Sequence, residues 1–262
     1  MANHYQPSAV LRDNAKGFLN GNYRGTTLVT ITFALFNYLS GMLLMNFDGI
    51  VEKIFYRAGK VSVGAAITSF TISYLLNAVL AAFVGVFTIG SALYYLKIGV
   101  GKRPVLSDVF SGYRENFSRN LGVSVFVTLP TILVVYPSSL FEQLYSYTKD
   151  VKFLIGALVS SAVALVVAVF VEVSIGLAPF LIADFPELSA SEAVKKIWNK
   201  MNGHRFRLFK LYLSFVPYVL LAVLSLGIGF LWVQPLIQES LAQFYLDLMN
   251  PKKVTGEWER TV

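Results

Sequence analysis

The chain has 262 residues, of which 55% are hydrophobic and only 14% charged, and its 22 Lys and Arg outnumber 15 Asp and Glu. An average soluble domain carries about 25% charged residues, so composition argues against a water-soluble fold and a disordered chain. The absence of cysteine excludes disulfides and Cys-ligated zinc. The charges are clustered, which leaves long uncharged runs at 25–47, 61–96, 120–141, 153–171 and 211–238. About 20 apolar helical residues cross a bilayer core, so we predict an all-α, polytopic transmembrane helical bundle forming one integral membrane domain over 1–262.

Residues 8–19 are predicted to form an amphipathic helix, because Leu11, Ala15 and Leu19 fall on one helix face. The first membrane span follows at 26–44. The residues that precede this span are mostly polar, so we expect it to be a retained span rather than a cleaved signal peptide.

The run 61–96 would extend about 54 Å as one helix, nearly twice the hydrocarbon thickness. The second span is therefore placed at 71–96. A second amphipathic helix is predicted at 106–117, where apolar residues follow helical spacing. The third span, at 121–140, contains Pro130, which should bend it.

The fourth span is predicted at 153–182, where 30 residues imply a tilt or a break. A third amphipathic helix follows at 189–202. Its start is indicated by Ser189 and Glu192, which are spaced as a capping box.

The stretch 211–248 is too long for one span, and its glycine-containing segment 225–229 is the predicted break. Spans at 209–225 and 228–248 give six in total, whereas an unbroken stretch gives five. With the N-terminus inside, six spans place 17 of the 22 Lys and Arg on the inner side, three of them in the C-terminal tail. Five spans leave the tail outside and weaken this bias, so the positive-inside rule favours six.

Each inner segment thus carries a short amphipathic helix before an outward-going span. These helices either anchor the loops or form a surface that binds lipid or a partner. The third one has an apolar stripe and a basic opposite face, which suits an anionic inner leaflet. The predicted lipid-interface residues are Lys195, Lys196, Trp198, Lys200, Arg205, Arg207 and Lys210. The expected partners are the bilayer, its anionic inner-leaflet lipids and a membrane protein; the net charge of +7 is explained by topology, so no nucleic acid is expected.

Glu172 is the sharpest intramembrane candidate, because it follows 19 uncharged residues and a carboxylate at bilayer depth is costly. One hypothesis makes it a proton- or cation-coupling residue that faces the bundle interior. The other places it near the end of a tilted span, or pairs it structurally with Asn77 or another polar group.

Polar residues also gather in the last predicted span. Glu239 and Gln243 share one helix face, and Gln234 and Gln238 share another. This pattern fits a polar cavity, and it fits a shallow or interfacial final helix equally well.

The stretches Ala183–Ala193, Met201–Phe209 and Leu224–Gly229 lie in the C-terminal third, and Gly21-Asn22-Tyr23 and Ser107–Tyr113 lie nearer the N-terminus. Together they resemble a bacterial, mainly Gram-positive, family of integral membrane proteins known as domain of unknown function 975, and the C-terminal stretches are the most specific. The resemblance covers nearly the whole chain, and it implies a multi-span plasma-membrane protein without an established activity.

No metal-ligand spacing, nucleotide-binding fingerprint or catalytic motif is present in the sequence. We therefore expect no enzyme, no catalytic residue, no metal and no cofactor, in a bacterial plasma-membrane protein with both termini cytoplasmic. The leading hypothesis is a non-enzymatic protein that binds a partner or lipid, with envelope stress or peptide immunity as its setting. The alternative is a small transporter or channel, which requires Asn77, Glu172 and Glu239 to converge on one cavity.

Overall fold

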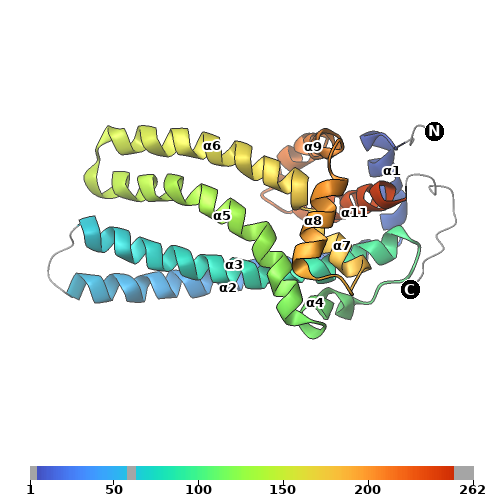
Figure 1. Cartoon of the computed structure of the whole chain (residues 1–262), viewed down its shortest axis with the longest axis horizontal. Coiled ribbons are helices and arrows are strands. Elements are labelled where there is room, and N and C mark those ends of the chain that lie inside the picture. Colours follow the sequence, from blue (N-terminus) through green and yellow to red (C-terminus); the bar gives the residue numbers. More distant parts are fainter. Residues whose placement is uncertain (1–4, 58–62, 251–262) are drawn as a thin grey trace. The chain divides into compact units, whose positions relative to one another are not determined.

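The computed structural model describes residues 5–57 and 63–250, with the backbone alone at 48–57. Over these residues the chain is helical and forms no strand, which confirms the all-α helical bundle (Figure 1). The helices, in chain order, are α1 Ser8–Leu19, α2 Tyr23–Arg57, α3 Val63–Gly99, the 3₁₀ helix η1 Leu106–Phe110, α4 Ser111–Arg114, α5 Phe117–Thr148, α6 Val151–Ile175, α7 Ala178–Asp184, α8 Ala190–Lys200, α9 Arg205–Leu213, α10 Val216–Leu224 and α11 Phe230–Met249.

Several helical segments are long and apolar enough to cross a membrane: Tyr23–Phe47, Val63–Gly99, Phe117–Thr148, Val151–Asp184 and Arg205–Leu224. The sixth predicted span, 228–248, coincides with α11, which is not among them because its acidic and amide side chains lower its hydropathy. The number of spans therefore stays a prediction. Lys60 and the tail residues Lys252, Lys253 and Arg260, which entered the charge count, lie outside the described residues.

Two of the predicted continuous helices are broken. The segment 106–117 is η1 followed by α4, and Asn116, with φ of 49°, separates α4 from α5. The span 153–182 ends as α6 at Ile175, and α7 restarts with Pro179 in its first turn, where proline is tolerated because its missing N–H has no helical partner.

The last stretch breaks where predicted, between α10 and α11. Leu226 and Gly227 both have positive φ, at 56° and 88°. The amide of Gly227 donates to the carbonyl of Ala222, and this contact closes α10. An earlier break that the sequence did not predict separates α9 from α10, with Pro217 in the first turn of α10.

The described chain divides into two compact units. Unit 2 comprises residues 35–85 and 124–172, which form the hairpin of α2 with α3 and the hairpin of α5 with α6 (Figure 1). The hydroxyl of Tyr74 on α3 donates to the carbonyl of Ile132 on α5 at 2.8 Å, and the hydroxyls of Thr71 and Tyr136 lie 2.9 Å apart. Polar side chains thus join the two hairpins within unit 2.

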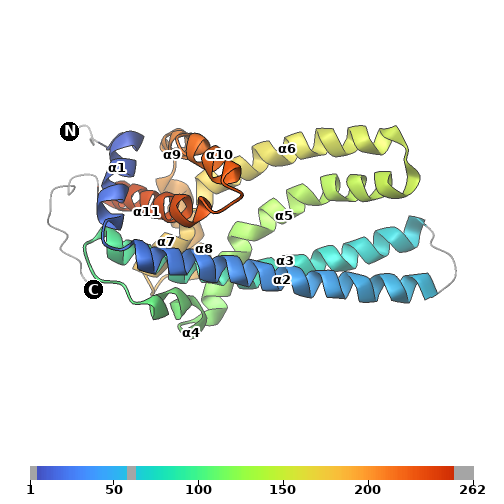
Figure 2. The same cartoon turned by 180° about the vertical axis from the view of Figure 1, so that it is seen from behind.

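Unit 1 comprises residues 1–34, 86–123 and 173–262, and its core surrounds α11. The amphipathic helix predicted at 8–19 is α1, but its apolar residues Leu11, Ala15 and Leu19 are buried against protein. Figure 2 shows α1 lying beside α11, with which it makes its main contacts. The apolar stripe of α1 is therefore explained by packing rather than by a bilayer interface.

Close backbone approach fixes α3 against η1 and α4 in unit 1. A methyl group at Gly90 would overlap the carbonyl oxygen of Val109, and one at Gly112 would lie 2.5 Å from the carbonyl oxygen of Val86. Only glycine allows both approaches, and these glycines fix the position of the loop after α3.

Gly90→Ala should lower the melting temperature of the purified protein, because the overlap is with backbone that cannot rotate away. Overpacking of this kind costs about 1–3 kcal/mol. Gly17→Ala in α1, where a methyl group meets open space, is the matched control and should stabilise by up to about 1 kcal/mol. Equal melting temperatures for the two variants would contradict the close approach.

Candidate functional site

The surface of unit 1 carries aromatic and basic side chains on α8 and α9, all of them exposed except Arg205, which is half-buried. We call this the basic–aromatic surface; it consists of Lys195, Trp198, Lys200, Arg205, Phe206, Phe209 and Lys210. Trp198 is 42% exposed and Phe206 is 66% exposed. The Arg205 guanidinium lies 4.4 Å from the Trp198 ring centroid, and the Lys210 ammonium lies 4.7 Å from that of Phe206. Trp198 and Phe206 are therefore each paired with a cation, and Phe209 stacks on Phe206.

The start of α8 is set by its own side chains. The Ser189 amide donates to Oε2 of Glu192 at 2.9 Å, and the Glu192 amide donates to Oγ of Ser189 at 3.3 Å. This confirms the predicted capping box. Hydrogen bonds from Ser189 lower the pKa of Glu192, since they favour the ionised carboxylate.

The opposite face of α8 is buried. Ala193, Ile197 and Met201 are covered by protein, in part by α7, so the apolar stripe predicted at 189–202 packs inside unit 1. Lys196 is exposed, and its ammonium lies 4.3 Å from the ring centroid of Phe185. The exposed apolar part of α8 is thus narrower than its apolar stripe indicates.

Arg207 was predicted at the lipid interface but lies in the interior. Its guanidinium forms an ion pair with Asp247 on α11, and it donates to the carbonyl of Gln6 at 3.0 Å. The Asp247 side chain is 2% exposed. The Gln6 amide lies 3.4 Å from both Asp247 carboxylate oxygens. Arg207 therefore joins α9, α11 and the N-terminal segment.

His204 precedes α9 and lies beside this ion pair. Its ring contacts Tyr5, with ring centroids 4.3 Å apart. Burial, and then the nearby Arg207 cation, lower the pKa of His204. Both effects disfavour the protonated imidazole.

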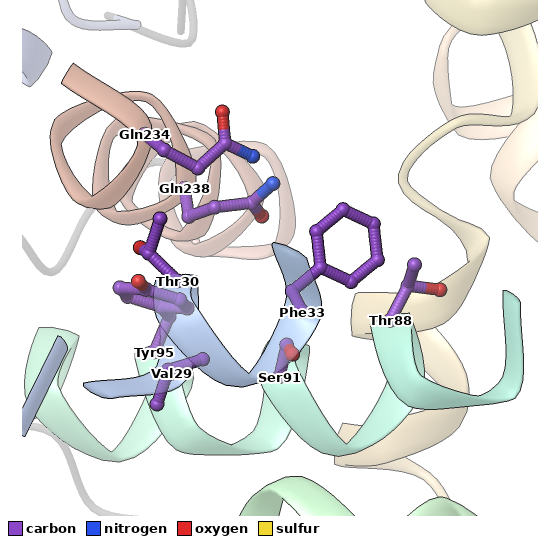
Figure 3. Close-up of a pocket in the computed structure, with 8 residues that line it drawn as sticks. All are labelled: Val29, Thr30, Phe33, Thr88, Ser91, Tyr95, Gln234 and Gln238. Atoms are coloured by element: carbon purple, nitrogen blue, oxygen red, sulfur yellow. The ribbon is translucent and has the colours of Figure 1, made fainter. Parts of the chain in front are cut away.

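A polar cavity lies inside unit 1, between α2, α3 and α11 (Figure 3). Its volume is about 40 Å³. Its lining residues are Val29, Thr30 and Phe33 of α2, Thr88, Ser91 and Tyr95 of α3, and Gln234 and Gln238 of α11. The two glutamines were predicted to share a helix face, and Figure 3 shows both side chains at the cavity.

Glu239 follows Gln238 on α11 and is fully buried, although it is not among the residues that line the cavity. Its Oε1 accepts a hydrogen bond of 2.8 Å from Nε2 of Gln243, the partner expected from helical spacing. A methyl group at Gly99 would lie 3.1 Å from Oε1 and 2.8 Å from the Gln243 amide nitrogen. The missing side chain at Gly99 therefore lets the pair lie against α3.

The three residues of the predicted transport path are placed differently. Asn77 lines a cavity of about 540 Å³ in unit 2 that also includes Tyr74 and Gln143. Glu172 is exposed and is not among the residues lining that cavity, which does not fit an interior-facing coupling role. Glu239 belongs to unit 1. The transport hypothesis stays a prediction, and the cavity at Asn77 is the feature that supports it.

The family model described as Protein of unknown function (DUF975) matches residues 1–252. The chain belongs to this DUF975 family. The match confirms the resemblance expected from the sequence. No curated protein and no solved structure matches the chain.

The sequence did not reveal several partners in this DUF975 protein. Asp247 and Gln6 are separated by 241 residues, so no local spacing predicts that both contact Arg207. Tyr245 donates to Asp184 at 2.9 Å, which is again a long-range contact. For the face of α3 that meets α11, one signal was available in the sequence. Tyr95 and Gly99 are four residues apart, which places them on one face of α3.

Lowering the pH should destabilise the protein through His204. Unfolded histidine titrates near pH 6.5, whereas the folded pKa is lower. Between these two pKa values the unfolded state binds more protons than the folded state. The contribution of His204 to the free energy of unfolding is therefore complete above about pH 6.5 and is lost as the pH falls through the folded pKa. Melting temperature measured from pH 8 to 5 should fall less steeply for His204→Gln than for wild type. Parallel curves would refute the assignment.

The contact of Gln6 with Asp247 requires the N-terminal segment and the end of α11 to lie on the same side of the membrane. Because the chain lacks cysteine, a single introduced cysteine is the one thiol available for labelling, and its labelling shows on which side of the membrane it lies. A membrane-impermeant maleimide should label Asn20→Cys and Asn250→Cys from one side and Lys149→Cys from the other. Labelling of Asn20→Cys and Asn250→Cys from opposite sides would contradict the contact.

Proposed function

We propose that this DUF975 protein is a non-enzymatic, multi-pass protein of the bacterial plasma membrane that binds anionic phospholipids through the basic–aromatic surface. The observation that carries the proposal is the exposure of Trp198 and Phe206 beside Arg205 and Lys210. Tryptophan and other amphipathic rings favour the headgroup level of a bilayer, and clustered cations favour anionic lipid.

The position of this surface supports the proposal. Lys200 and Arg205 lie at the start of the apolar segment Arg205–Leu224, where a span enters the headgroup region. The positive-inside rule assigns this end to the cytoplasmic leaflet. We therefore propose that both termini are cytoplasmic. A membrane protein partner would dock on the same side, and it stays a prediction.

The ring–cation pairs give the surface a preferred ligand. A guanidinium stacked on an indole still directs its N–H groups outward to phosphate oxygens, and arginine binds such groups in bidentate fashion. The rings cover the apolar side of each cation. The chemistry therefore fits a phosphodiester headgroup with its acyl chains alongside α9.

The test measures phosphatidylglycerol binding to the purified full-length protein in neutral detergent, by native mass spectrometry. The triple variant Lys200→Gln, Arg205→Gln and Lys210→Gln should lose affinity, by about fivefold per cation, because each cation near an anionic surface contributes about 1 kcal/mol. Phosphatidylcholine binding should change little.

The control variant is Lys149→Gln with Lys152→Gln, which removes cations from unit 2. It should bind phosphatidylglycerol like wild type. The proposal fails if the control variant loses as much affinity per cation as the triple variant, or if the triple variant binds normally. A second variant, Trp198→Ser with Phe206→Ser, keeps the charges and should weaken binding of both lipids.

A further inference from the structure

We infer that the polar cavity of unit 1 binds one desolvated monovalent alkali cation. The ligands are hydroxyl and amide oxygens of α2, α3 and α11, and the charge of the cation is balanced by Glu239. This site is separate from the basic–aromatic surface and goes beyond the proposed function.

The size of the cavity sets the class of ligand. A volume of about 40 Å³ is too small for an organic substrate, since such sites measure about 300–1,000 Å³. It holds a few atoms at most, because one water needs about 10–15 Å³ of such space. A single ion, or up to about three water molecules, fits.

The lining chemistry favours an ion. Six of the lining side chains offer oxygen atoms: Thr30, Thr88, Ser91, Tyr95, Gln234 and Gln238. They come from α2, α3 and α11 and line the same cavity (Figure 3). Hard cations prefer carbonyl and hydroxyl oxygens of this kind.

Two buried polar atoms at or beside the cavity lack partners. Tyr95 is 1% exposed, and its hydroxyl lies near that of Thr30 without a hydrogen bond of standard geometry. Within the part of the chain that the structure describes, Oε2 of Glu239 has no hydrogen-bond partner either. Leaving such groups unsatisfied costs about 1–3 kcal/mol each. A cation in the cavity is coordinated by the Tyr95 oxygen, and its charge compensates the carboxylate of Glu239 beyond the lining.

Glu239 is the acidic side chain that balances the charge of the cation in this proposal. Its carboxyl group lies against α3 at Gly99, one turn from Tyr95. Lys97, two residues from Tyr95 on α3, is already paired with Asp108, and Arg207 is paired with Asp247. One carboxylate and one monovalent cation leave the interior neutral, whereas an unpaired buried charge is strongly unfavourable.

The experiment compares the melting temperature of the purified protein in sodium or potassium chloride with that in choline chloride at equal concentration, which keeps ionic strength constant. A ligand that binds only the folded state stabilises it. Wild type should melt at least about 3 °C higher in one of the alkali salts. Tyr95→Phe, which removes one ligand oxygen and keeps the ring, should reduce the shift, and Glu239→Gln should abolish it.

Two matched controls keep the test specific. Glu172→Gln neutralises an exposed carboxylate, and Tyr38→Phe removes an exposed hydroxyl; both should retain the full shift. Equal melting of wild type in all salts would overturn the inference and leave a cavity that holds water only. An undiminished shift in both Tyr95→Phe and Glu239→Gln would overturn it too. If Glu239→Gln does not fold, Gln238→Leu replaces it, with the same expected loss.

Discussion

The ion pair between Arg207 and Asp247 is the contact on which the organisation of unit 1 depends. It joins α9 to α11 and also binds the backbone of Gln6. The Gln6 amide donates to Asp247, and the Gln6 carbonyl accepts from Arg207. Breaking a buried pair leaves an uncompensated charge, which costs about 3–5 kcal/mol. The N-terminal segment, α9 and the end of α11 are therefore held together in unit 1.

The role of α11 follows from its burial rather than from its hydropathy. The helix is too polar to qualify as a span by hydropathy, yet most of its residues from Val233 to Leu248 are buried inside unit 1. A helix that is surrounded by protein does not need an apolar exterior. Its glutamines and Glu239 face other helices, where polar groups in a membrane protein find partners or line a cavity. The polarity that makes α11 look like a poor span is what builds the interior of unit 1.

The sequence predicted the parts of the fold that follow from local chemistry. Periodicity located α1, a capping box located α8, and glycine located the break before α11. What it could not predict is what covers an apolar stripe. The stripe of α1 fits a membrane interface and a protein core equally well by spacing, and only the long-range contact with α11 decides between them. The helical pairing of Glu239 with Gln243 was predictable for the same local reason, whereas the contact of Arg207 with Asp247 was not.

The basic cluster after α8 shows how one segment serves two purposes. Arg205 and Arg207 are two residues apart, so they project about 200° apart around α9. Arg205 stacks on the exposed Trp198, whereas Arg207 enters the interior and pairs with Asp247. The positive-inside rule treats the two as equal contributions to topology. The helical period places the two side chains on different faces of α9. Arg205 can therefore reach a phosphate group at the surface, whereas Arg207 is held in its ion pair with Asp247.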